Sequence, residues 1–117
     1  MKRAAKSALI GKWRITKMAL WDNDYLDMVE PAYIQFKASG RGEFKFGCVV
    51  GDLDCTLFAD AVDFTWQGSD EMDPVFGDGW AELDDDGTIN GEISFHLGDE
   101  STFQGNRPLA AALCAGE

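Results

Sequence analysis

Basic residues are scarce in this sequence, and that scarcity excludes one large class of partners. Ten Lys and Arg stand against 21 Asp and Glu in 117 residues, a formal net charge of −11. Six of the ten cations lie in the first 17 residues, so the rest of the chain has four basic and 21 acidic side chains. Such a field repels phosphate backbones, and we therefore expect no nucleic-acid partner.

Long apolar runs and a cysteine framework are also missing. No run reaches the roughly 18 residues of a membrane span, and residues 1–10 lack the apolar core and cleavage site of a secretory signal. The cysteines Cys48, Cys55 and Cys114 have no CxxC spacing, and their odd number does not suit a secreted disulfide framework. Zinc-ligand spacings and glycine-rich phosphate loops are absent too. We expect a cytoplasmic protein with no membrane partner, no metal and no cofactor.

The residues that are abundant favour short strands and tight turns. The chain has 13 glycines and 14 aromatic residues but only three prolines, and apolar and polar side chains alternate with period two along most of it. This alternation predicts strands over residues 11–18, 32–38, 42–50, 53–59, 62–67, 79–84, 88–97 and 101–107. Between the first two, Asp22 or Asn23 is a suitable N-cap for a short helical segment that Pro31 ends.

Tight turns between these strands indicate their connectivity. An open eight-stranded meander would expose two edges, and closure into a barrel removes them. The sequence therefore predicts an all-β fold: a single small up-and-down antiparallel β-barrel of about eight strands, with a short helical segment near residues 22–30. The expected organisation is a basic N-terminal arm at 1–10, the barrel at 11–107 and a C-terminal tail at 108–117.

Turn chemistry then predicts the register of the hairpins. A two-residue turn at Gly51-Asp52 would place Cys48 opposite Cys55, with both side chains on the core face. By the same reasoning the other expected pairs are Phe36 with Phe44, Leu57 with Phe64, Leu83 with Ile89, and Phe95 with Phe103. Residues 67–79 show no such turn, and they are expected to form a long irregular acidic loop.

Two short sequence features resemble the calycins, the superfamily of lipocalins, avidins and fatty-acid-binding proteins. Gly11-Lys12-Trp13 lies on the first expected strand, and Arg107 ends the last one. The resemblance implies a closed meander barrel with a ligand at one mouth, Trp13 in the floor and the Arg107 side chain against the indole. A cation over the Trp13 ring would contribute about 0.5 to 2 kcal/mol.

Longer segments are similar to a family of small uncharacterised bacterial proteins, some of which are carried on mobile gene cassettes. The segments are WDNDYLDMVEPAYIQFKASGRGEFKFG, FTWQGSDEMDP and ISFHLGDES, and together they cover most of the chain. This resemblance implies a bacterial cytoplasmic protein, and it implies no particular activity.

Two patterns that could support chemistry are weak. Glu92, Ser94 and His96 share a strand face, but neighbours two residues apart lie about 7 Å from each other, too far for the hydrogen bonds of a catalytic triad. Residues 82–93 echo a calcium-binding loop, yet Ile93 stands where the bidentate Glu is required. We therefore expect no catalytic residues, and an enzyme is the least favoured of the functions considered.

Binding is the favoured function. Its expected location is the two long connections, residues 21–30 and residues 67–79. Loops on a rigid scaffold commonly carry function, and these two combine acidic with aromatic or Met side chains. The expected ligand-binding residues are Trp21, Tyr25, Met28, Trp66, Asp70, Glu71, Asp73 and Phe76. They would suit a small molecule such as a cationic amphiphile, in a pocket that Trp13, Tyr33, Phe64, Trp66 and Phe95 line or floor.

An acidic interaction module is the alternative. The strand parity places Trp80 on the outer face of the barrel, where a large aromatic side chain marks a contact surface or lies under a neighbouring segment. The partner would be a basic protein segment or a second copy of the chain in a homodimer.

Overall fold

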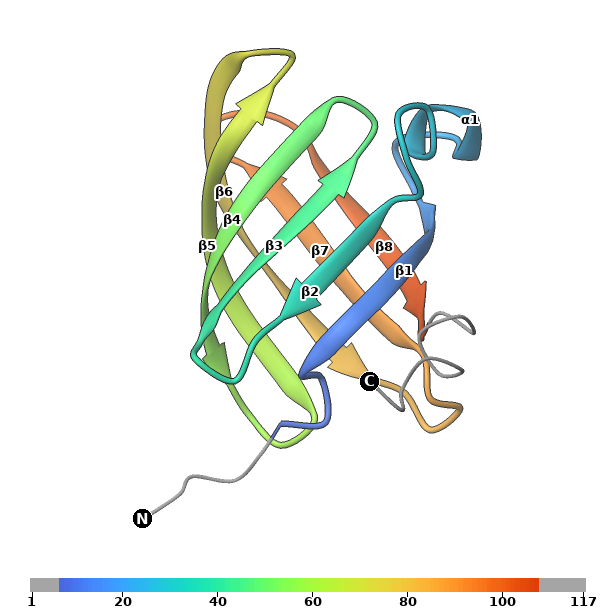
Figure 1. Cartoon of the computed structure of the whole chain (residues 1–117), viewed down its shortest axis with the longest axis vertical. Coiled ribbons are helices and arrows are strands. Elements are labelled where there is room, and N and C mark those ends of the chain that lie inside the picture. Colours follow the sequence, from blue (N-terminus) through green and yellow to red (C-terminus); the bar gives the residue numbers. More distant parts are fainter. Residues whose placement is uncertain (1–6, 108–117) are drawn as a thin grey trace.

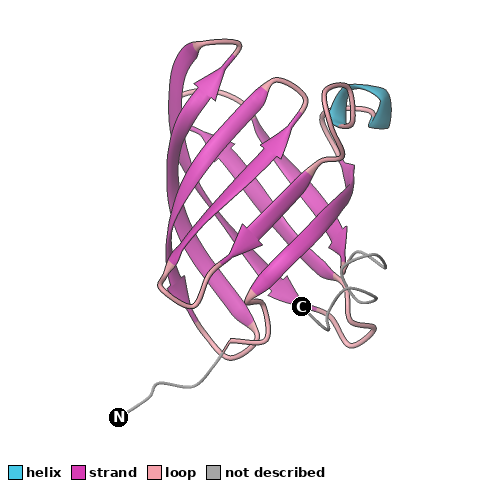
Figure 2. Ribbon diagram, in the orientation of Figure 1, coloured by secondary structure: helices cyan, strands magenta, loops and turns pink. Residues whose placement is uncertain are grey.

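The chain forms a closed antiparallel barrel whose eight strands follow one another in sequence order (Figures 1 and 2), which confirms the predicted fold class. The structure is a computed structural model that describes residues 7–107; the expected tail at 108–117 and Cys114 lie outside the described residues. The elements are β1 (Gly11–Met18), α1 (Asn23–Leu26), β2 (Tyr33–Phe36), β3 (Arg41–Phe46), β4 (Val49–Leu57), β5 (Ala61–Asp70), β6 (Asp73–Leu83), β7 (Ile89–Phe95) and β8 (Glu100–Asn106).

Closure is made between the first and last strands. β1 pairs with β2 on one side and with β8 on the other, with an irregularity between Ile15 and Lys17. Trp13 is buried next to this seam, and the Arg107 guanidinium carbon lies 4.0 Å from the centre of its ring. Arg107 also donates hydrogen bonds to the carbonyls of Ala8 and Ile10. The predicted stacking of Arg107 on Trp13 is therefore confirmed.

The β3–β4 turn is not at the predicted glycine. It is formed by Gly47 and Cys48, with Gly47 at a φ of 55°, and Phe46 pairs with Val49 across it. Gly51 instead lies within β4 opposite Phe44, and Cys55 pairs with Phe64 of β5. The predicted pairing of Cys48 with Cys55 is therefore wrong.

Other hairpins show smaller register errors. Leu83 pairs with Ile89 as predicted, whereas Phe44 faces Ile34 rather than Phe36. Two further pairs differ from the prediction: Leu57 faces Val62, and Phe103 faces Gly91. Each error is a slip by an even number of residues, which changes the partners but leaves every side chain on its predicted face.

Residues 67–79 form a hairpin rather than an irregular loop. β5 and β6 pair continuously from Ala61 opposite Glu82 up to Asp70 opposite Asp73. The turn residues Glu71 and Met72 have positive φ values of 49° and 77°. Two central residues with positive φ are the requirement of a type I′ turn, which normally uses Asn and Gly, so the Glu-Met sequence concealed the hairpin.

Aromatic rings fill the barrel by packing over glycines on the inner face. A Cβ on Gly51 would lie 2.7 Å from the Phe44 ring, and one on Gly91 would lie 2.7 Å from the Phe103 ring. Phe44 and Phe95 both contact Trp66 edge-on, with ring centres 4.9 Å and 5.0 Å from it. A side chain at these glycines would displace the rings, so the glycines are a packing requirement.

Each end of the barrel is covered by a chain segment. Residues 7–10, which the sequence assigns to the basic arm, close one end with Leu9 fully buried, and the Trp13 indole N–H donates to the Leu9 carbonyl over 2.9 Å. Residues 19–32, including α1, cover the other end with Leu26 buried (Figure 1). As predicted, Asp22 caps α1, accepting from the Tyr25 N–H at 3.0 Å.

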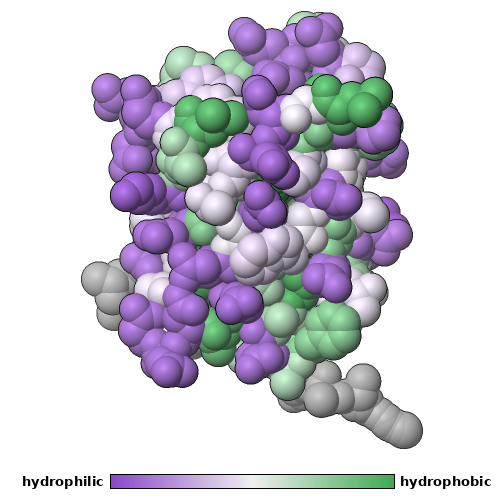
Figure 3. Space-filling model, turned by 180° about the vertical axis from the view of Figure 1, so that it is seen from behind, coloured by the Kyte–Doolittle hydropathy of each residue, from purple (hydrophilic) through white to green (hydrophobic). Residues whose placement is uncertain are grey.

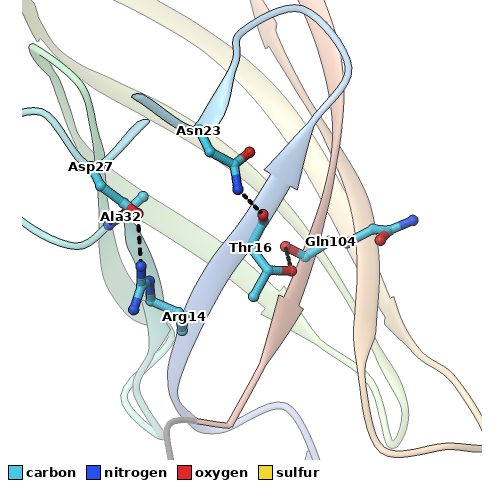
Figure 4. A network of polar contacts seen from close by, with 6 residues as sticks. All are labelled: Arg14, Thr16, Asn23, Asp27, Ala32 and Gln104. Atoms are coloured by element: carbon cyan, nitrogen blue, oxygen red, sulfur yellow. Dashed lines mark hydrogen bonds and ion pairs between the residues drawn. The ribbon is translucent and has the colours of Figure 1, made fainter. Parts of the chain in front are cut away.

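Polar contacts hold the segment of residues 19–32 to β1 (Figure 4). Arg14 forms a 2.7 Å ion pair with Asp27, whose other carboxylate oxygen accepts from the Ala32 N–H over 3.0 Å. The Asn23 side chain donates to the Thr16 carbonyl over 3.1 Å. The contacts from Asn23 and Asp27 fasten the middle of the segment to β1, and we call the segment of residues 19–32 the cap.

Candidate functional site

The outward faces of β4 to β7 form a hollowed surface that is rich in carboxylates. Two adjoining hollows of about 760 Å³ and about 560 Å³ share Asp54, Thr65, Asp78 and Ser94. The strand register arranges the side chains in rows across the sheet. The rows are Thr56, Asp63, Trp80 and Glu92, then Asp54, Thr65, Asp78 and Ser94, then Asp52, Gln67 and Phe76. We call this surface the acidic groove.

Exposed aromatic side chains lie among these carboxylates. Phe76 is 54% exposed and stacks with the His96 ring at a centroid distance of 4.6 Å. Trp80 points outward, as the strand parity predicts, and its indole N–H donates to Glu92 over 3.3 Å. The view from behind (Figure 3) shows hydrophilic side chains interspersed with paler and hydrophobic ones. The groove therefore offers apolar contact and negative charge together.

The groove carboxylates have no ion pair within residues 7–107. The ion pairs in that part of the chain join Arg14 to Asp27 and Lys45 to Glu30, both away from the groove. Arg41, opposite Asp54 in the β3–β4 ladder, is the cation lining the larger hollow. An excess of carboxylates with so little compensation attracts a cationic partner.

The residues predicted to bind a ligand fall into three places. Trp66 and Phe76 line the larger hollow of the groove, although Trp66 itself is only 3% exposed. Asp70, Glu71 and Asp73 lie at the β5–β6 turn, at the same end of the barrel as the cap (Figure 1). The third set, Trp21, Tyr25 and Met28, belongs to the cap.

The cap closes its end of the barrel instead of opening a mouth. The Trp21 ring lies 4.9 Å from that of Phe46 and 6.1 Å from that of Phe95. Tyr25 covers Gly47, and its hydroxyl accepts from the Cys48 N–H over 3.3 Å. Burial, with smaller contributions from Asp70 and Glu71, raises the Tyr25 pKa. Trp21 and Tyr25 thus act as a packed lid over the aromatic interior.

The expected lining of an internal pocket is mostly used for packing. Trp13, Phe64 and Trp66 are buried in the core, and Phe95 packs against it. Tyr33 lies outside the barrel, where its hydroxyl donates to Glu43 over 2.7 Å and Lys12 covers its ring. Its assignment to the pocket was wrong because odd-numbered residues of β2 face outward.

The residues of the triad-like and calcium-like patterns make only local contacts. His96 lies in the β7–β8 turn against Phe76, and Ser94 and Glu92 belong to different rows of the groove. Asp86 accepts from both the N–H and the hydroxyl of Thr88, which lowers its pKa, and Asp84 accepts from Asn90. Over residues 7–107 no group of three or more His, Cys, Asp or Glu side chains is placed to hold a metal ion. Nor does that part of the chain contain a helix with the length and hydrophobicity to cross a bilayer.

The carboxylates in the three rows of the groove were absent from the predicted site. These are Asp52, Asp54, Asp63, Asp78 and Glu92, all at outward positions of their strands. The signal available was the alternation itself, because Asp52, Asp54 and Asp78 fall on the polar phase of their strands. Their convergence depends on which strands neighbour one another and on the curvature of the sheet.

Comparison with known proteins identifies no relative: no family model, no curated protein and no solved structure matches this chain. The arrangement of its own side chains is therefore the basis for a functional proposal.

Proposed function

We propose that this is a non-enzymatic binding protein of the cytoplasm whose acidic groove takes a basic segment of a protein partner. The observation that carries the proposal is the cluster of carboxylates on β4 to β7 without ion pairs in residues 7–107, next to exposed Phe76 and Trp80. Cationic side chains would gain charge contacts there, and their alkyl stems would cover the rings.

The spacing along β6 describes the ligand more closely. Phe76, Asp78 and Trp80 alternate along one outward face, so the Cα atoms of the two aromatic residues are about 13 Å apart with Asp78 midway. An extended segment repeats with the same spacing at every second residue. It would therefore present Lys or Arg to Asp78 and apolar side chains to the two rings.

Fluorescence anisotropy tests the proposal with a labelled peptide that repeats Leu-Ser-Lys-Ser, here called the Leu-Lys peptide, because Leu and Lys then share one face of the extended chain. We expect binding that weakens steeply with added salt, because the contacts are exposed charge pairs. The triple variant Asp54→Asn, Asp63→Asn, Asp78→Asn should lose about tenfold or more in affinity, about 1.4 kcal/mol.

The matched control is Asp24→Asn, Asp60→Asn, Asp85→Asn, which removes the same charge from exposed positions outside the groove. If both triple variants weaken binding equally, net charge alone governs association and the groove has no specific role. Absence of binding to the unmodified protein at low salt would also contradict the proposal.

A second candidate function rests on the end of the barrel that carries the cap. Exposed apolar side chains project there from the cap and from two turns, namely Leu20, Met28, Val29, Met72 and Leu97. With Asp70, Glu71 and Asp73 nearby, this end would suit a cationic amphiphile held on its surface. Replacing those three acids by Asn, Gln and Asn should abolish amphiphile binding in a thermal-shift titration while changing stability by about 0.5 kcal/mol or less.

A further inference from the structure

The described chain begins beside one end of the acidic groove. Ala8 donates its N–H to the carbonyl of Ala59 over 2.8 Å, in the turn between β4 and β5. Burial of Leu9 fixes this position. Thr56 and Asp63 pair in the row of the groove nearest that turn, and Phe58 and Ala61 lie between this row and the turn. The chain therefore enters the barrel beside the turn that joins β4 to β5, two of the strands that form the groove.

The six residues before this point are strongly basic. Residues 1–6 read MKRAAK, with three cations and no acidic side chain, and they lie outside the described residues. Six extended residues reach about 20 Å. From Asp63 to Gln67, the two ends of the groove along β5, four residues of strand span about 14 Å. The segment is thus long enough to pass along all three rows.

We propose that residues 1–6 occupy the acidic groove of their own barrel and compete there with the basic partner. The inference rests on the proposed function of the groove. The cations Lys2, Arg3 and Lys6 would face the carboxylates of the groove. The short connection gives the segment an effective concentration of the order of millimolar, so even weak charge contacts populate the bound state. The segment would then regulate the groove by masking it.

The test uses the full chain with the substitutions Lys2→Gln, Arg3→Gln and Lys6→Gln. Nitrogen-15 NMR spectra should show shifts at the Trp80 indole and at the amides of Asp63 and Asp78, relative to the unmodified protein. Affinity for the Leu-Lys peptide should rise about two- to fivefold, because the competing segment has been weakened. The matched control is Lys12→Gln, Lys17→Gln, Lys37→Gln, which removes equal charge from positions outside the groove, and it should produce neither effect.

The possible results separate this inference from the function on which it rests. If the unmodified protein binds the peptide and the first variant shows neither groove shifts nor higher affinity, the segment does not occupy the groove, and the proposed function stands. If groove shifts occur but neither protein binds the peptide, the function is wrong and the intramolecular contact stands. Shifts that disappear on dilution would show that the segment reaches a second copy, which contradicts occupation of its own barrel.

Discussion

The two faces of β4 to β7 use the same strands for different purposes. On the inner face, rings pack over glycines, as Phe44 does over Gly51, and little space is left for any change. On the outer face, carboxylates and two exposed aromatic side chains surround a hollow. The difference indicates that stability is concentrated on the inside of these strands, while the outside is available for binding.

The outer face of β1 to β3 differs from the groove in how its charged side chains are paired. There, Lys45 pairs with Glu30 at 2.7 Å, and Lys12 covers the Tyr33 ring at 4.2 Å. Two cations on that side thus have partners within the molecule. The groove carboxylates lack ion pairs in residues 7–107, which is the reason to assign a partner to the groove.

Two tryptophans test the contrast between inner and outer faces most strongly. Trp66→Ala should lower the free energy of unfolding by about 3 to 5 kcal/mol, because it empties the space between Phe44 and Phe95. Trp80→Ala should cost about 1 kcal/mol or less, since the ring lies at the surface. Urea denaturation of both variants measures the difference, and equal losses would contradict the division of roles.

A substitution at Gly51 tests whether the interior has spare room. A Cβ there would meet the Phe44 ring at 2.7 Å and the Trp66 ring at 3.0 Å. Gly51→Val should therefore destabilise the barrel by about 1 to 3 kcal/mol through overpacking. Gly98→Ala is a milder comparison, because its added Cβ would come no closer than 3.3 Å to the Phe95 side chain and its φ is outside the left-handed region. A neutral or stabilising Gly51→Val would reveal an open interior.

Neutralising the groove should hardly change stability. In Asp54→Asn, Asp63→Asn, Asp78→Asn, we expect each site to alter the free energy of unfolding by about 0.5 kcal/mol or less. Relief of repulsion among like charges should make the sum slightly favourable at low ionic strength. Thermal unfolding of the variant and the unmodified protein at low and high salt measures this change in stability. A large fall in the free energy of unfolding would mean that these carboxylates stabilise the fold, which would contradict a role in binding alone.

Titration of Tyr33 tests the hydrogen bond between its hydroxyl and Glu43 on the outer face of β2. Burial, and then the hydrogen bond to Glu43, raises its pKa to about 12. Because the pKa of the phenol is raised in the folded state, the contribution of Tyr33 to the free energy of unfolding is complete below pH 10. That contribution is lost as the pH rises through 12. The chain has two tyrosines, so tyrosinate absorbance in Tyr25→Phe reports on Tyr33 alone. Glu43→Gln should lower the midpoint toward 10, and a midpoint already at 10 with Glu43 present would contradict the contact.

The sequence predicted which face each strand residue occupies better than which residue it pairs with. Period-two alternation is insensitive to even slips, so Phe44 was correctly turned inward although its partners were not correctly identified. Gly47 and Gly51 are four residues apart and both suit a turn; Gly51 is instead required on the inner face by the Phe44 ring. Only the packed structure distinguishes the two glycines.

The candidate site was harder to predict for two physical reasons. The tight turn at Glu71 and Met72 uses residues that seldom adopt positive φ, so β5 and β6 were cut short and an irregular loop was inferred. The groove also joins Asp54, Asp63 and Asp78 from three strands, and no local pattern reports their proximity. Trp80 could be predicted because its outward position depends on parity alone.

Binding of a basic segment at the acidic groove is best tested by a nitrogen-15 NMR titration of the full chain with the Leu-Lys peptide. We expect saturable shifts at the Trp80 indole and at the amides of Asp63, Thr65 and Asp78, with the Trp21 indole unchanged. Shifts concentrated at Trp21 and the cap, or no saturable shifts at all, would contradict the assignment of binding to the outer face of β4 to β7.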